Sequence, residues 1–329
     1  MRYYDLKLFA PGSTQPVREW TSHPGGVFDP GALDIELDVG IAPYATPYGA
    51  STIIVHGVSL ADLQQVNSWG MDGASPQGYT IQLYGGMQAG LPLANPKQAK
   101  LLFAGAVFQA FGNWEGTEMH IVFVVSASGF SPSLPGNFVL NWQAGQPLSQ
   151  AMANCMKVAY PTLPQEIHIS PSLVLSYTQV HPAHTLESLA GWVNAFTSQH
   201  FNNPVSIYLQ AGVVFVIDST YSPTPKQIAF TDLMGQPTWI GVKTLQMKFV
   251  MRGDLNVGDL IEMPQALQSP QGLAVPGIVL SQQSSYPSSI KYRTTFNGTF
   301  RVTSIRQVGH YRQPDGAAWA TIVNGVING

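Results

Sequence analysis

The segment 32–42, ALDIELDVGIA, alternates apolar and acidic side chains with a period of two. This period places successive side chains on opposite faces of an extended strand, whereas the apolar positions of a helix recur every three to four residues. The apolar side chains on one face are Leu33, Ile35, Leu37 and Val39, and the acidic ones opposite are Asp34, Glu36 and Asp38. The segment therefore predicts a strand with one buried and one wet face.

Similar segments recur along the chain, separated by tight turns that draw on 32 Gly and 25 Pro residues. We expect further strands at 51–57, 79–84, 101–111 and 117–126. Between the first two of these, Ser59 is a candidate N-cap for a short helix with Leu60, Leu63 and Val66 at helical spacing. Residues 1–125 are thus predicted to form a β-barrel or sandwich with one short helix.

The middle of the chain has a different pattern. Residues 147–161 and 185–200 place apolar side chains along one helix face, and 205–218 predicts a strand or a hairpin. Residues 126–225 are therefore expected to form a small α+β domain. Residues 226–329 return to strands around a Pro- and Ser-rich loop at 269–290. The predicted fold class is mainly β, α+β overall, with two β-barrel domains on either side of the insert.

Charged residues are scarce, since Asp, Glu, Lys and Arg make up 10% of the chain against about 25% in a typical soluble domain. This scarcity favours a surface that partner chains largely cover. The first 96 residues have three basic and eight acidic side chains, a balance of −5, whereas residues 226–329 have nine and five, a balance of +4. The two ends of the chain are therefore expected to meet different neighbours.

Export and membrane signals are not predicted. Cys155 is the only cysteine, which excludes an intrachain disulfide and fits synthesis in a cytosol. The first twelve residues lack the apolar run of a signal peptide, and no segment has the roughly 18 uninterrupted apolar residues of a membrane helix.

Four patterns suggest chemistry, but each has a simpler explanation. Glu115 and Glu118 could form a glycosidase pair, yet they flank a predicted hairpin turn. His181 and His184 lack a third metal ligand, and Cys155 falls on the apolar face of a helix with His168 as its nearest histidine in sequence. The tripeptide at 252–254, Arg-Gly-Asp, falls in a predicted turn between strands. We expect no enzyme, no cofactor and no metal site.

The acidic residues Asp34, Glu36 and Asp38 are the charged feature with the strongest functional interpretation. They can simply form the wet face of an amphipathic strand. Three acids on one strand face repel one another, however, at a local cost that Thr or Gln would avoid. A face turned towards a channel is the alternative purpose.

The segment from Asp232 to Pro264, DLMGQPTWIGVKTLQMKFVMRGDLNVGDLIEMP, has a Gly-x-Pro turn, an alternating strand, a Gly/Asp turn and a second short strand. It resembles the second tube-type barrel of tailed-phage baseplate hub proteins. The segments IVHGVSLADLQQVN, YTIQLYGGMQAGLPLANP and FQAFGNWEGTEMHIVF resemble the first barrel of that family. The resemblance spans most of residues 51–264 and includes no catalytic residue. It implies that Gly235, Pro237, Trp239, Leu245, Met247 and Phe249 belong to a barrel wall or interface.

The resemblance also implies a structural function, because the family includes late-control proteins of contractile phages and the hub part of type VI secretion spikes. It implies a homotrimeric ring in the virion baseplate, made in the host cytoplasm, which joins a hexameric tail tube protein to a central spike or cell-puncturing protein. Other baseplate proteins would bind it, DNA would contact its channel transiently, and the chain would not insert into a membrane. The alternative is a β-rich carbohydrate-binding or cell-wall-degrading tail component, in which Trp69, Trp114 and Trp142 stack on sugars.

Overall fold

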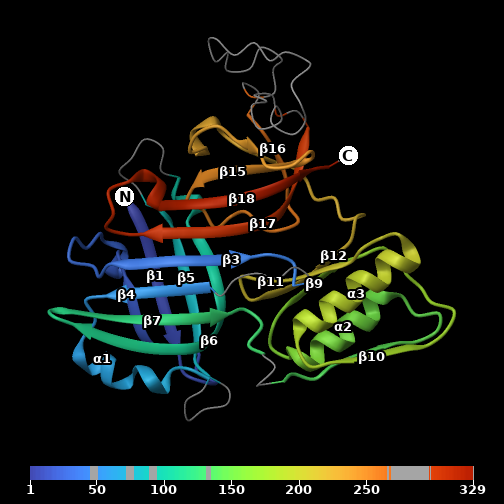
Figure 1. Cartoon of the computed structure of the whole chain (residues 1–329), viewed down its shortest axis with the longest axis horizontal. Coiled ribbons are helices and arrows are strands. Elements are labelled where there is room, and N and C mark those ends of the chain that lie inside the picture. The colour runs from blue at the N-terminus through green and yellow to red at the C-terminus, as the bar shows by residue number, and fades with distance from the viewer. Residues whose placement is uncertain are drawn as a thin grey trace.

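The computed structural model describes residues 1–44, 51–71, 78–88, 95–130, 135–264, 267, 296 and 298–328. In this part of the chain, most strands belong to one large bent sheet, and an α+β unit lies beside it with two smaller sheets (Figure 1). The loop expected at 269–290 lies outside the described residues.

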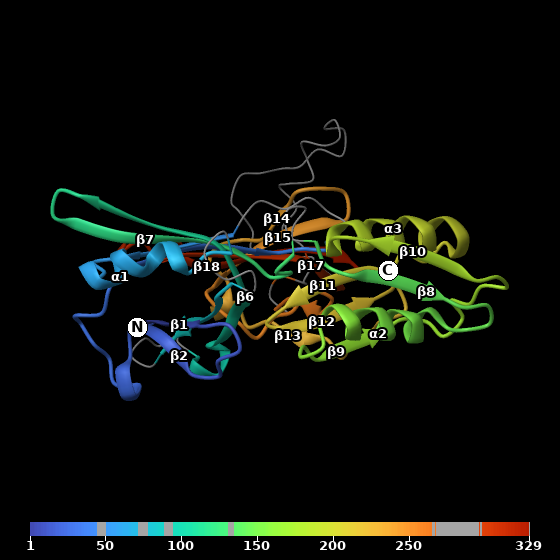
Figure 2. The same ribbon diagram turned by 90° about the horizontal axis from the view of Figure 1, so that it is seen from below.

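The first β-domain is a folded antiparallel sheet. Its strands are β1 (Arg2–Phe9), β2 (Pro16–Thr21), β3 (Ile35–Ile41), β4 (Ser51–His56), β5 (Thr80–Met87), β6 (Lys100–Glu115) and β7 (Glu118–Ser126). Strand β6 pairs with β5 through its first half and with β7 through its second, and the register shifts between Val107 and Gln109. Such a bulge bends the strand, so β6 passes from one layer to the other and the apolar core lies between them (Figure 2).

A short helical segment packs against β6 and β7. Helix α1 (Leu60–Gln65) and the 3-10 turn η2 (Val66–Ser68) begin at Ser59, whose hydroxyl accepts a hydrogen bond from the Asp62 amide at 3.2 Å. Arg18 on β2 holds the Asp62 carboxylate at 2.6 Å. This ion pair joins α1 to the second layer. Two further 3-10 turns are η1 (Pro24–Gly26) and η3 (Pro96–Gln98).

The α+β unit has both expected helices. Its elements are β8 (Phe138–Trp142), α2 (Leu148–Ala159), β9 (Gln165–His168), β10 (Gln179–Ala183), α3 (Leu186–Phe201), β11 (Ser206–Gln210) and β12 (Val213–Ile217). The stretch at 205–218 is a hairpin: β11 and β12 are joined at Ala211 and Gly212, which both have positive φ, as the tight turns of hairpins require.

The second β-domain continues the large sheet. Its elements are β13 (Lys226–Gln227), η4 (Phe230–Asp232), β14 (Thr238–Trp239), β15 (Thr244–Val250), β16 (Leu260–Glu262), β17 (Thr299–His310), η6 (Gly316–Ala318) and β18 (Trp319–Ile327). Strand β17 pairs with β18 along one edge. Along its other edge it pairs first with β16 and then with β3 of the first β-domain. The two β-domains therefore share one sheet through the β17–β3 pair.

Three hydrophobic clusters stabilise these units, and two of the clusters include residues from a neighbouring unit. The cluster of the first β-domain includes Met251 and Trp319 from far along the chain. The cluster of the second includes Ile41, Tyr208 and Ile217. The α+β unit has a cluster of its own. The predicted class, mainly β with a small α+β unit, is confirmed. Within the described residues, no helix has the length and apolarity needed to cross a bilayer.

Candidate functional site: the outer face of the shared sheet

One face of the shared sheet turns away from both β-domain cores. It runs in sheet order over β14, β15, β18, β17, β3, β4, β7 and β6 (Figures 1 and 2). Its side chains alternate with core residues and keep part of their surface exposed, among them Asp38, Thr52, Ile54, Val122, Arg306 and Lys248. The strands come from both β-domains, so the face extends over both of them. It carries polar and apolar side chains together.

Strand β3 lies within this face, and the predicted acidic residues have partners there. His310 on β17 lies 2.9 Å from Asp34, whose carboxylate also accepts a hydrogen bond from the Arg312 amide. His56 on β4 lies 3.1 Å from Glu36. His310 and Arg312 follow Asp34 by 276 and 278 residues in the chain, so local periodicity does not predict these contacts.

Asp38 has the strongest partner of the three. The Arg306 guanidinium donates from Nε to Asp38 Oδ1 at 2.7 Å and from Nη2 to Oδ2 at 2.5 Å. These hydrogen bonds from Arg306 hold the pKa of Asp38 below its usual value, although partial burial acts in the opposite direction. The face is thus a set of acid and base pairs, not an uncompensated acidic stripe.

A shallow groove of about 280 Å³ runs beside these pairs. It is lined by Glu36, Asp38, Thr52, Ile54, Val308, His310 and Gln313 among others. The groove combines acidic and apolar walls on the outer face of β3, β4 and β17.

The residues assigned to a barrel wall lie in the second β-domain. Leu245, Met247 and Phe249 are fully buried in its core, and Trp239 is nearly so. Gly235 is exposed at the turn before β14, where its φ of 87° explains the need for glycine, and Pro237 is buried. The apolar members of this set pack inside their own chain.

The other patterns with possible chemistry have structural surroundings. Glu115 and Glu118 face each other at the exposed tip of the β6–β7 hairpin. Cys155 is buried, and burial raises the pKa of its thiol to about 11, so it is a poor nucleophile. Arg252 is buried between Asp232 and Asp254, which excludes an accessible recognition tripeptide. Of the tryptophans considered for sugar stacking, Trp69 and Trp142 are buried, and Trp114 is exposed near the hairpin tip.

His181 stacks on Trp192 of α3 with ring centroids 4.3 Å apart, and its Nε2 is buried without a hydrogen-bond partner. Burial lowers the pKa of His181, so the folded chain binds this proton more weakly than the unfolded chain does. The neutral, buried His181 therefore makes its full contribution to the free energy of unfolding above the unfolded-state pKa of about 6.5. This contribution decreases as the pH falls through that value. We expect the wild type to lose more urea resistance between about pH 7.5 and about pH 5.5 than a His181→Phe variant loses.

The matched control is His200→Gln, because His200 is exposed and stacks at the other end of the same ring column, on Phe196. This variant separates the effect of the buried His181 imidazole from that of removing a stacked ring elsewhere in the column. Equal losses in the wild type and in His181→Phe would contradict the assignment.

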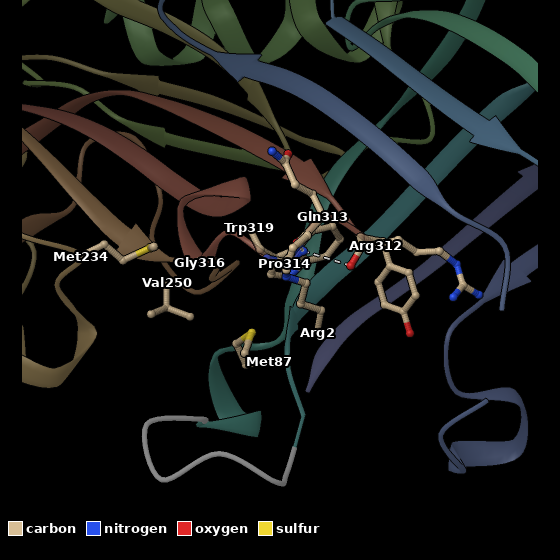
Figure 3. Close-up of a pocket in the computed structure, with 10 residues that line it drawn as sticks. Arg2, Met87, Met234, Val250, Arg312, Gln313, Pro314, Gly316 and Trp319 are labelled. Atoms are coloured by element: carbon tan, nitrogen blue, oxygen red, sulfur yellow. Dashed lines mark hydrogen bonds between the residues drawn. The ribbon is translucent and has the colours of Figure 1, made fainter. Parts of the chain in front are cut away.

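A second pocket, of about 440 Å³, lies where the two β-domains meet (Figure 3). Its apolar wall includes Met87, Met234, Val250 and Trp319. The Arg2 guanidinium beside it donates to the carbonyls of His310, Tyr311, Gln313 and Asp315. This arginine therefore tightens the junction between the domains. Among the residues that the structure describes, no cluster of His, Cys, Asp and Glu has the arrangement of a metal site.

Comparisons with known proteins find likeness in the fold and none in the sequence. No known protein family and no curated protein matches the sequence. A tail protein from Neisseria meningitidis MC58 matches the structure with a TM-score of 0.51 and 10% identity, over 98% of this chain and 96% of that one. At this identity the likeness shows the fold alone. At the level of the fold, it confirms the predicted resemblance to tail proteins.

Two other solved structures are similar at lower scores. One is an Escherichia coli component of the type VI secretion system, described as structurally similar to the bacteriophage T4 tail proteins gp27 and gp5. It has a TM-score of 0.48 and 8% identity, over 90% of this chain and 73% of that one. The other is a 43 kDa tail protein of prophage MuSo2 from Shewanella oneidensis, with a TM-score of 0.47 and 9% identity, over 90% of this chain and 98% of that one.

Proposed function

We propose that this protein is a structural component of a phage tail, the baseplate hub that joins the tail tube to the central spike. The observation that carries the proposal is the shared sheet: two β-domains of one chain stand side by side and present one continuous outer face. The fold of the Neisseria tail protein supports it.

In this proposal three copies form a ring. Three chains with two β-domains each place six β-domains around an axis, which matches a hexameric tube on one side and leaves threefold symmetry for a trimeric spike on the other. The outer face of the shared sheet lines the central channel, so Asp34, Glu36 and Asp38 face the passing DNA. Other baseplate proteins bind the outside of the ring.

The channel wall must let DNA pass without holding it. DNA affinity grows with the number of phosphates that a protein neutralises, so a wall whose cations are paired with carboxylates favours passage. The pair of Asp38 with Arg306 fits this requirement. The proposal assigns no hydrolytic activity, since the described residues at the hairpin tip and around Cys155 lack a catalytic setting.

Light scattering and low-resolution imaging test the proposal directly. We expect the purified protein to have about three times the 35.5 kDa mass of one chain and to form rings with a central hole. A stable monomer at micromolar concentration, or a compact particle without a hole, would contradict it.

A further inference from the structure

We propose that Asp38 masks the Arg306 guanidinium, and that this masking keeps the outer face of the shared sheet from binding the phosphate backbone of DNA. The inference deepens the proposed function, on which it rests, because it names the side chains that set the affinity of the channel wall for nucleic acid.

The geometry of the pair supports the masking. Arg306 donates through Nε and Nη2 to the two oxygens of one carboxylate, which is the forked geometry that guanidinium groups also use to bind phosphate. Gly40 is opposite Arg306 in the sheet register, so it places no side chain between Arg306 and the diagonal neighbour Asp38. A carboxylate and a phosphate would therefore compete for the same donors.

The exposure of the pair argues against a role in stability. The side chains of Arg306 and Asp38 are 50% and 44% exposed. Exposed ion pairs of this kind contribute little to stability, because solvent screens the two charges. Since the pair adds little to the folding free energy, its removal should leave the fold intact, and its purpose is better sought in the charge of the surface.

The surroundings of Arg306 would favour a polyanion once Asp38 is neutral. The register aligns Arg306 with Ile322 on β18 and then with Lys248 on β15, on the same face. Strands are spaced by about 4.8 Å, so the two cationic residues are about 10 Å apart across the sheet. The acids Asp34 and Glu36 have other partners, His310 and His56. Asp38 is thus the carboxylate that pairs with the positive charge of Arg306 on this face.

The test measures binding of a fluorescein-labelled DNA duplex of about 30 base pairs to the purified full chain at about 50 mM salt. We expect Asp38→Asn to bind about tenfold more tightly than the wild type. One added phosphate contact has a salt slope of about 0.9, which between about 1 M and about 50 mM salt corresponds to roughly a 15-fold gain in affinity. We expect the double variant Asp38→Asn/Arg306→Gln to return to the wild-type affinity. Glu187→Gln, which removes one exposed carboxylate from α3, is the matched control for net charge and should leave binding unchanged.

Two results would overturn the inference. One is an Asp38→Asn variant that binds DNA no better than the wild type. The other is a double variant that binds as tightly as Asp38→Asn, since the effect would then not come from Arg306. Light scattering on the same samples keeps the two proposals apart: intact rings without tighter binding refute only the masking, whereas the absence of rings in the wild type refutes the proposed function.

Discussion

Replacement of Arg252 by methionine should destabilise the protein by about 3 to 5 kcal/mol, the range found when one partner of a buried ion pair is removed. The Arg252 side chain is only 5% exposed, and those of Asp232 and Asp254 are 13% and 22% exposed. Its guanidinium binds both oxygens of Asp254, at 2.7 and 2.8 Å, and donates to Asp232 at 2.9 Å. Methionine would leave both carboxylates without their cation.

The network around Arg252 also joins the two β-domains, which enlarges the expected effect. Gln98, which precedes β6, donates to Asp232 and accepts from the Gly253 amide at 2.8 Å. Urea unfolding would measure the loss, with Arg306→Gln as the control because its pair with Asp38 is exposed and should cost about 0.2 to 1 kcal/mol. If the Arg252 variant unfolds within about 1 kcal/mol of this control, the network is not a major source of stability.

Replacement of Trp142 by alanine should cost about 3 to 5 kcal/mol in the α+β unit, as for other large aromatic side chains removed from a core. Trp142 has no exposed surface and stacks on Phe201 with ring centroids 5.9 Å apart. Its indole donates to the Gln146 carbonyl at 2.8 Å. Alanine would leave a cavity and an unpaired carbonyl, so we expect a large fall in the unfolding midpoint and faster proteolysis of α2 and α3.

Trp114→Ala is the matched control, because Trp114 is 62% exposed at the β6–β7 hairpin. Surface substitutions of this kind usually change stability by less than about 0.5 kcal/mol. Equal stability of the two variants would contradict the assignment of Trp142 to the core. The Trp114→Ala variant also tests the carbohydrate-binding alternative. If the folded variant loses sugar binding that the wild type has, this alternative is favoured.

Some strands of the structure are not among those predicted from the sequence. Strand β1 buries Tyr4, Leu6 and Leu8 at a period of two. The charged Asp5 and Lys7 between them complete the alternation of an amphipathic strand. The β8–β10 pair was also missed, because five-residue strands next to prolines and turns give a weak periodic signal.

Several local elements follow from the spacing of residues along the chain. The alternation at 244–250 became β15, the apolar faces at 147–161 and 185–200 became α2 and α3, and Ser59 became a helix cap. These outcomes follow from neighbours within a few residues, whose spacing fixes which side of the backbone is apolar. For the same reason, Asp34, Glu36 and Asp38 could be assigned to one strand face in advance.

The contacts between these elements depend on the tertiary fold. Arg306 and Asp38 are separated by 268 residues, and His310 and Asp34 by 276. Their contacts exist because β17 pairs with β3 in one register among many that similar apolar strands would accept locally. That choice depends on the packing of the whole sheet, so the charges that compensate the acidic residues, and the burial of Arg252, could not be deduced from local periodicity.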